Sequence, residues 1–315
     1  MKNNIDFKFM KEISGVNLAN FIIAGTEKAG TTSIFTYLST HPSVCGSTVK
    51  ETDFFRNSFT GNREKDIVSY SNYFERCSPE IPIVMEASPG YLGSGAEVAA
   101  RIHTLVPKTK LLFILRNPID RIYSSFNFHV GKLNLDSDLS FEKYIDKCIA
   151  YDSGQRTPAE LGIKEWYLKI ISFGRYADYL KYYYQLFPEN QIKIMFFENM
   201  SQDIDGFMCE LCQFLEISPD YFNGYDFRRI NVTYESKLKW LHKIAVYFNA
   251  KSERFLRQRP ELKQLMVKLY KKINQAREGY DEISDESRDR LKQYYLPSIT
   301  ALQTLIGTKN IPWNI

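Results

Sequence analysis

Four short apolar runs, separated by segments with helical spacing, constrain the fold of this chain more than any other feature. The runs cover residues 20–25, 83–87, 111–116 and 191–197. Helical spacing covers residues 31–40, 96–105, 118–130, 141–150, 176–187 and 203–215. Short buried strands that alternate with helices are typical of a parallel sheet covered on both faces. The sequence therefore predicts an α/β fold in which helices flank a central parallel sheet.

The part of the chain after residue 235 differs, because only helical spacing is found there, with breaks at Pro260 and near Gly279. No internal repeat or low-complexity linker divides the 315 residues, a length that suits one large domain. We therefore predict a single domain over residues 1–315. Its core would cover about residues 18–230, and a helical C-terminal elaboration would cover about residues 235–315.

Composition narrows the functional classes. A net charge of +4 suits an anionic ligand but does not indicate a nucleic-acid partner. No window approaches 18 apolar residues and the N-terminus lacks a signal-like apolar region, which predicts a cytoplasmic protein without a transmembrane segment. Five scattered cysteines, an odd number, argue against a disulfide framework. Cys209 and Cys212 form a C-x-x-C without a partner pair, so a metal site is not expected there.

The stretch "FIIAGTEKAGTT", residues 21–32, has the skeleton of a phosphate-binding loop with its lysine in an unusual place. Four residues separate Gly25 from Gly30, as in a P-loop, but the lysine lies inside the loop as Lys28. A strand, a glycine turn and a helix N-terminus present unpaired N–H groups and a positive dipole end to an anion. An ordinary capped strand–turn–helix is the alternative. We predict a P-loop-like anion site made of Lys28, Ala29, Gly30, Thr31, Thr32 and Ser33.

A second stretch, "LLFILRNPIDRIYSSF" at residues 111–126, repeats this logic. Arg116 ends an apolar run, Pro118 suits the first turn of a helix, and Ser124 lies two turns inside it. An arginine fork can bind a phosphate through two hydrogen bonds, whereas a purely structural Arg116 would pair with a carboxylate. A kinase needs an acidic residue at such a strand end to hold magnesium. Arginine in its place predicts phosphate binding without a metal.

Together the two stretches resemble the sulfotransferases that use 3'-phosphoadenosine 5'-phosphosulfate (PAPS). The matching residues are Lys28, Gly30, Thr31 and Thr32 for the family's 5'-phosphosulfate loop, and Arg116 and Ser124 for its 3'-phosphate motif. Further similarity is to the branch with the heparan sulfate sulfotransferases and many bacterial relatives. It lies in "HPSV…KETDFF", "EASPGYL", "GRYADYLKYYYQLFP" and Trp313, so it runs from about residue 20 to the C-terminus.

The resemblance implies transfer of a sulfuryl group from PAPS to a hydroxyl, or as a second choice to an amine, without a metal. Lys28 would contact the leaving 5'-phosphate, where negative charge grows in the transition state. Arg116 and Ser124 would hold the 3'-phosphate. The expected acceptor is a bacterial saccharide or a small secondary metabolite, and the oligomeric state is left open. The rival interpretations are a P-loop nucleotide kinase and a non-catalytic anion-binding protein.

The resemblance also indicates the general base. Glu51 in "KETDFF" matches the family's base, and we expect the aromatic residues after it to desolvate it partly. A surface pair with Lys50 is the structural alternative. His129 is the second candidate, because family members that act on small phenols and steroids use a histidine. Ala87 stands where the heparan sulfate enzymes have a lysine at the sulfuryl group. Either Lys50 or Lys237 replaces that cation, or this chain lacks it.

The stretch of residues 237–277 is rich in lysine and arginine, interleaved with apolar residues. It is interpreted as a solvated helix face, and binding to an anionic glycan or an acidic membrane is the alternative.

Overall fold

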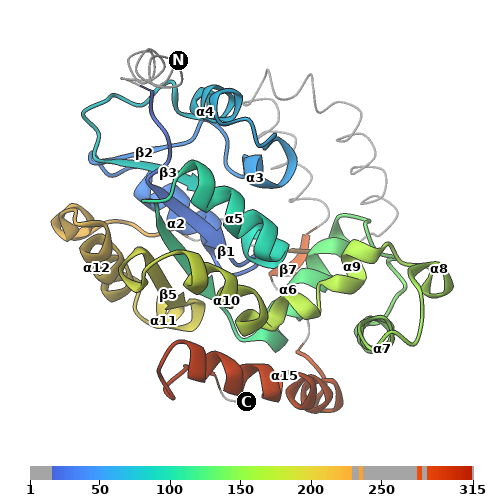
Figure 1. The fold of residues 1–315 in the computed structure, drawn as a ribbon. Coiled ribbons are helices and arrows are strands. Elements are labelled where there is room, and N and C mark those ends of the chain that lie inside the picture. The colour runs from blue at the N-terminus through green and yellow to red at the C-terminus, as the bar shows by residue number, and fades with distance from the viewer. Residues whose placement is uncertain (1–15, 229–233, 237–274, 279–281, 314–315) are drawn as a thin grey trace. The chain divides into compact units, whose positions relative to one another are not determined.

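The computed structural model describes residues 16–228, 234–236, 275–278 and 282–313 (Figure 1). The chain divides into two compact units. The first comprises residues 1–118, 175–228 and 295–315, and the second comprises residues 119–174 and 229–294. The prediction of a single domain stays a prediction. Most of the basic stretch, with Lys237 and Pro260, lies outside the described residues, as does Gly279.

The first unit is built on a five-stranded parallel sheet with the strand order β2–β3–β1–β4–β5. The strands are β1 Phe21–Gly25, β2 Val44–Gly46, β3 Ile83–Ala87, β4 Lys110–Leu115 and β5 Ile192–Phe196. Every residue of β1 and β3 is buried, which explains why β1 is a continuous apolar run and why Glu86 is the one charged residue in β3. The predicted α/β fold with a central parallel sheet is therefore confirmed. The edge strand β2 was not predicted, because three residues are too few to form a recognisable run.

Helices of the first unit follow the strands in the alternation that the sequence predicts. They are α2 Thr31–Leu38, α3 Phe54–Asn57, α4 Arg63–Ser71, α5 Gly95–Leu105, α10 Tyr176–Leu186, α11 Phe197–Gln202 and α12 Ile204–Leu215. Helices α5 and α10 pack against each other (Figure 1). None of the helices in the described part of the chain has the length and apolarity needed to cross a membrane.

The second unit contains most of α6 Pro118–Gly131, followed by α7 Phe141–Asp152, α8 Pro158–Leu161 and α9 Glu165–Lys169. The helix α15 Asp285–Leu305 begins in this unit. Here the structure corrects the expectation of only helices after residue 235: β6 Tyr234–Ser236 pairs antiparallel with β7 Gln275–Glu278. Pairing between segments so far apart in the chain depends on tertiary structure, which local periodicity does not contain.

The cysteines give a second correction. Cys45 in β2 and Cys77 form a disulfide across 32 residues of sequence, with their Cα atoms 5.6 Å apart. The expectation against disulfides is therefore wrong for this pair, because the fold brings the edge strand β2 beside the turn that contains Cys77. Cys148, Cys209 and Cys212 are free thiols. Burial raises the pKa of Cys212 to about 11, so this thiol is not activated.

Candidate functional site

The loop that follows β1 has a backbone conformation that depends on its glycine. Gly30 is the N-cap residue of α2 with φ of 76°, a left-handed value that glycine adopts without strain. A Cβ atom at this position would lie 2.4 Å from Met200 Cε, so the loop packs tightly against α11. Lys28 also has a positive φ, of 67°. Since Gly30 has no side chain to cap α2, the first turn of the helix suits an anion.

Arg116 connects this loop to the second predicted anion motif. It directly follows β4, the sheet neighbour of β1, and its Nη1 donates a hydrogen bond of 2.9 Å to the carbonyl oxygen of Lys28. The Phe197 ring lies under the guanidinium, with Cζ 4.6 Å from the ring centroid. Cations stack favourably on aromatic faces in this way. Two motifs 88 residues apart in the sequence thus meet at the carboxyl ends of neighbouring parallel strands.

The other predicted site residues lie in different surroundings. Ala29 and Thr31 are buried in the loop and the first turn of α2, and Thr32 and Ser33 are partly exposed there. Ser124 is partly exposed on α6, in the second unit. The structure therefore brings together the loop residues and Arg116 within the first unit.

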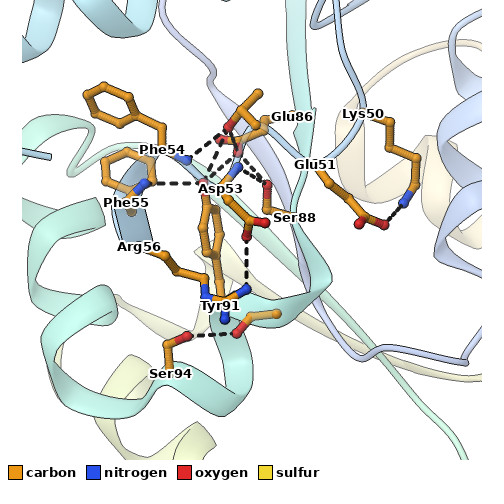
Figure 2. A network of polar contacts seen from close by, with 12 residues as sticks. Lys50, Glu51, Asp53, Phe54, Phe55, Arg56, Glu86, Ser88, Tyr91 and Ser94 are labelled. Carbon is orange, nitrogen blue, oxygen red and sulfur yellow. Dashed lines mark hydrogen bonds and ion pairs between the residues drawn. The ribbon is translucent and has the colours of Figure 1, made fainter. Parts of the chain in front are cut away.

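Glu51 is anchored through its backbone rather than through its side chain. Its N–H donates to the carbonyl oxygen of Ala87 at the end of β3, at 2.8 Å, and its φ is 64°. Its carboxylate lies 2.5 Å from Lys50 Nζ and its side chain is 53% exposed. Figure 2 shows this ion pair apart from the network around Glu86. Non-glycine residues with positive φ are strained, and such strain is concentrated at functional sites.

The expected partial desolvation of Glu51 by its aromatic neighbours is not what the structure shows. Phe54 and Phe55 are fully buried and pack against Tyr70 in the interior. The chain turns at Glu51 and Asp53, both with positive φ, so the rings enter the core while the Glu51 carboxylate stays at the surface. The surface pair with Lys50 was the alternative, and it is present. An accessible carboxylate can still accept a proton from a bound acceptor.

A buried acid lies beside this loop, and the sequence alone did not predict it. Glu86 is fully buried near the end of β3, and its carboxylate accepts hydrogen bonds from four hydroxyl groups. Figure 2 shows Glu86 with two of these donors, Ser88 and Tyr91. The donors are Ser88 Oγ at 2.7 Å, Tyr91 OH at 2.6 Å, Thr52 Oγ1 and Tyr70 OH. Burial raises the pKa of Glu86 against the lowering effect of these bonds. The signal in the sequence was an acidic residue inside the apolar run "IVMEA".

Glu86 holds the residues that follow Glu51 in the chain. Thr52 donates to Glu86 directly, and the backbone N–H of Asp53 donates to Ser88 Oγ at 3.1 Å. Ser88 in turn donates to Glu86. The left-handed turn at the candidate base is therefore held by a buried polar network whose members support one another.

His129 occupies the last turn of α6 in the second unit. It is 9% exposed, its Nδ1 lies 3.2 Å from Asn134 Nδ2, and its ring lies 4.9 Å from that of Tyr167. These contacts describe a packed, hydrogen-bonded histidine. The part of the chain that the structure describes holds no group of three or more His, Cys, Asp or Glu residues that could bind a metal.

Comparisons with known proteins identify the family of this chain. A family model described as "Sulfotransferase domain" matches residues 18–296. A bifunctional heparan sulfate N-deacetylase/N-sulfotransferase of Drosophila melanogaster is 26% identical, over 94% of this chain and 27% of that protein. The human bifunctional heparan sulfate N-deacetylase/N-sulfotransferase 3 is 29% identical, over 67% of this chain and 24% of that protein. The chain thus spans about a quarter of the length of these curated relatives.

A solved structure shares the fold of this chain. It is described as a sulfotransferase from Alicyclobacillus acidocaldarius, with a TM-score of 0.62 and 24% sequence identity. The match covers 94% of this chain and 98% of that chain.

Proposed function

Because this chain belongs to the sulfotransferase family, whose enzymes depend on PAPS, we propose that it transfers a sulfuryl group from PAPS to a hydroxyl group. The acceptor would be a saccharide or a small secondary metabolite. The reaction would be an in-line displacement without a metal.

The observation that carries this proposal is the hydrogen bond from Arg116 Nη1 to the Lys28 carbonyl. It supports a shared binding site in which the loop after β1 receives the 5'-phosphosulfate and Arg116 receives the 3'-phosphate. Ser124 would add a hydroxyl donor to the 3'-phosphate. The 3'-phosphate distinguishes PAPS from ATP, and a guanidinium suits its recognition.

In the proposed reaction the acceptor oxygen attacks sulfur while the bond from sulfur to the bridging oxygen breaks. The leaving group is 3'-phosphoadenosine 5'-phosphate (PAP), and Lys28 stabilises the charge that grows on its 5'-phosphate. The acceptor proton moves to a general base. Glu51 is the first candidate for that base and His129 is the second.

An amine acceptor is the second candidate function. Two relatives are named N-sulfotransferases, which favours nitrogen, whereas Ala87 replaces the lysine expected in the heparan sulfate enzymes. Lys50 is one replacement for that cation, because it lies beside Glu51. The family match counts against a nucleotide kinase. A non-catalytic anion-binding protein would bind PAP without any transfer.

Two measurements test this proposal. Calorimetry should show that PAP binds more tightly than AMP by about ten- to a hundred-fold, since a charge-assisted contact contributes roughly 1.5–3 kcal/mol. A mass-spectrometric screen of saccharides, phenols and amines with PAPS should find a product with an added sulfuryl group. Equal affinities for PAP and AMP would contradict the assignment of Arg116 and Ser124 to the 3'-phosphate.

The compartment is a separate question. The sequence predicts the cytoplasm, whereas a disulfide such as Cys45–Cys77 is typical of oxidising compartments. Thiol counting on protein trapped from its native cells decides between them: five free thiols agree with the cytoplasm and three agree with an oxidising compartment.

A further inference from the structure

The short helix α11 lies beside both predicted anion motifs of the first unit. Its first residue, Phe197, stacks under the guanidinium of Arg116, with Cζ 4.6 Å from the ring centroid. Met200 and Phe197 are also the nearest neighbours of a Cβ atom placed on Gly30. One six-residue helix thus contacts the residues proposed for both ends of the donor.

The second residue of α11 bridges two distant segments. Glu198 Oε1 accepts a hydrogen bond of 2.8 Å from the backbone N–H of Asn117. Glu198 Oε2 accepts one of 2.9 Å from Trp313 Nε1. The partners lie 81 and 115 residues from Glu198 in the sequence. Hydrogen bonds to an ionised carboxylate are among the stronger ones, so this bridge is well suited to fix a turn.

Trp313 also packs near Tyr176, which binds the carbonyl oxygen of Arg116. Its ring lies 5.9 Å from that of Tyr176 and 5.5 Å from that of Phe196, and its side chain is buried. The hydroxyl of Tyr176 donates to the carbonyl oxygen of Arg116 at 2.6 Å. The carbonyl of Arg116 and the N–H of Asn117 belong to one peptide group. Both polar atoms of this group are therefore held, by two side chains that each contact Trp313.

We propose that Glu198, Tyr176 and Trp313 are positioning residues that orient Arg116 toward the 3'-phosphate of the donor. This inference rests on the proposed function, because it assumes that Arg116 binds that phosphate. Locking the peptide plane after Arg116 fixes the direction in which its side chain leaves the sheet. A bidentate fork needs its geometry within about 10–20° to deliver its full binding energy.

The test compares two ligands that differ only in the 3'-phosphate. Calorimetry on the full chain gives the preference, the ratio of the Kd for AMP to the Kd for PAP. Trp313→Phe removes the N–H but keeps a ring, Glu198→Gln keeps the shape, and Tyr176→Phe removes the hydroxyl. Each should lower the preference by about three- to tenfold, the size of one hydrogen bond, and leave AMP affinity within about twofold.

Matched controls separate positioning from a general loss of structure. Glu189→Gln changes an exposed glutamate of the same unit, and Trp166→Phe removes an indole N–H elsewhere. Both should keep the preference of the unchanged protein. If Glu198→Gln unfolds, Trp313→Phe and Tyr176→Phe carry the test.

The outcomes distinguish this inference from the proposed function. If the unchanged protein prefers PAP but the three variants retain that preference, the positioning role is wrong and the proposed function stands. The positioning role is also wrong if the variants lose affinity for AMP and PAP equally. If the unchanged protein shows no preference for PAP, the role of Arg116 fails and this inference fails with it.

Discussion

The hydroxyl of Tyr91 donates a hydrogen bond of 2.6 Å to the carboxylate of Glu86, a side chain that is fully buried. The carboxylate is surrounded by hydroxyl donors, and burial still raises its pKa above the ordinary value of 4.5. A buried acid is retained here where an amide or an apolar residue would avoid the penalty of burying a charge. Its bonds fix Thr52, which lies between the left-handed residues Glu51 and Asp53. They also fix Ser88, which accepts a hydrogen bond from the backbone N–H of Asp53.

Replacing Glu86 should change how stability depends on pH. Because its pKa is raised in the folded state, Glu86 contributes stability that is fully present below its unfolded pKa and is lost as pH rises through the folded value. Glu86→Gln cannot titrate. We expect the variant to lose about 1–3 kcal/mol from disrupted hydrogen bonds, and to lose more at pH 4.5 than at pH 8. Urea denaturation at several pH values between 4.5 and 8 measures the free energy of unfolding of both proteins. Parallel pH curves for variant and unchanged protein would contradict the expectation, and Glu189→Gln serves as the control.

Gly30→Ala tests the loop at its tightest point. The substitution combines the strain of a left-handed residue, roughly 1–2 kcal/mol, with a contact of 2.4 Å to Met200 Cε. Met200 is flexible enough to move, so we expect the protein to fold with a lower melting temperature and to bind PAP about tenfold less tightly.

Gly61→Ala is the matched control for that change. Gly61 has φ of 82° and nothing within 4 Å of an added Cβ atom, so it carries the same backbone strain without the contact. It should lower the melting temperature and leave PAP affinity unchanged. If Gly30→Ala also leaves PAP affinity unchanged, the loop after β1 does not bind the donor.

The features that sequence predicted well are local ones. The apolar runs predicted β1, β3, β4 and β5 to within about a residue, because these strands are mostly apolar, with charged exceptions such as Glu86 in β3 and Lys193 in β5. The glycine spacing of the first motif and the arginine after β4 could also be located, because each is defined by residues that are close together in the sequence. The strand order, by contrast, is a tertiary property.

The features that could not be predicted from the sequence depend on segments far apart in the chain. The Cys45–Cys77 disulfide spans 32 residues, and the bond from Trp313 to Glu198 spans 115. The exposure of Glu51 was mispredicted for a different reason. Positive φ values at Glu51 and Asp53 send neighbouring side chains in different directions. The segment "KETDFF" contains no glycine that would have predicted this left-handed backbone.

Removal of metal ions should have little effect on the reaction. Arg116 occupies the strand end where a kinase holds the acidic magnesium ligand. Transfer from PAPS should therefore be nearly unchanged in EDTA, measured with an acceptor from the screen. A strict magnesium requirement would support the kinase interpretation.

The last prediction separates the proposed roles of three residues by kinetics with a working acceptor. Lys28→Ala removes the positive charge that is proposed to stabilise the leaving 5'-phosphate. We therefore expect kcat to fall by about 10²–10³-fold and donor binding to weaken. Glu51→Gln keeps the shape but removes the base, so PAP should bind normally while kcat falls by about 10²–10⁴-fold. His129→Ala should lose much less activity, because His129 is packed against Tyr167 and hydrogen-bonded to Asn134. The opposite result, with normal turnover in Glu51→Gln and none in a folded His129→Ala, would make His129 the base and leave Glu51 as the surface partner of Lys50.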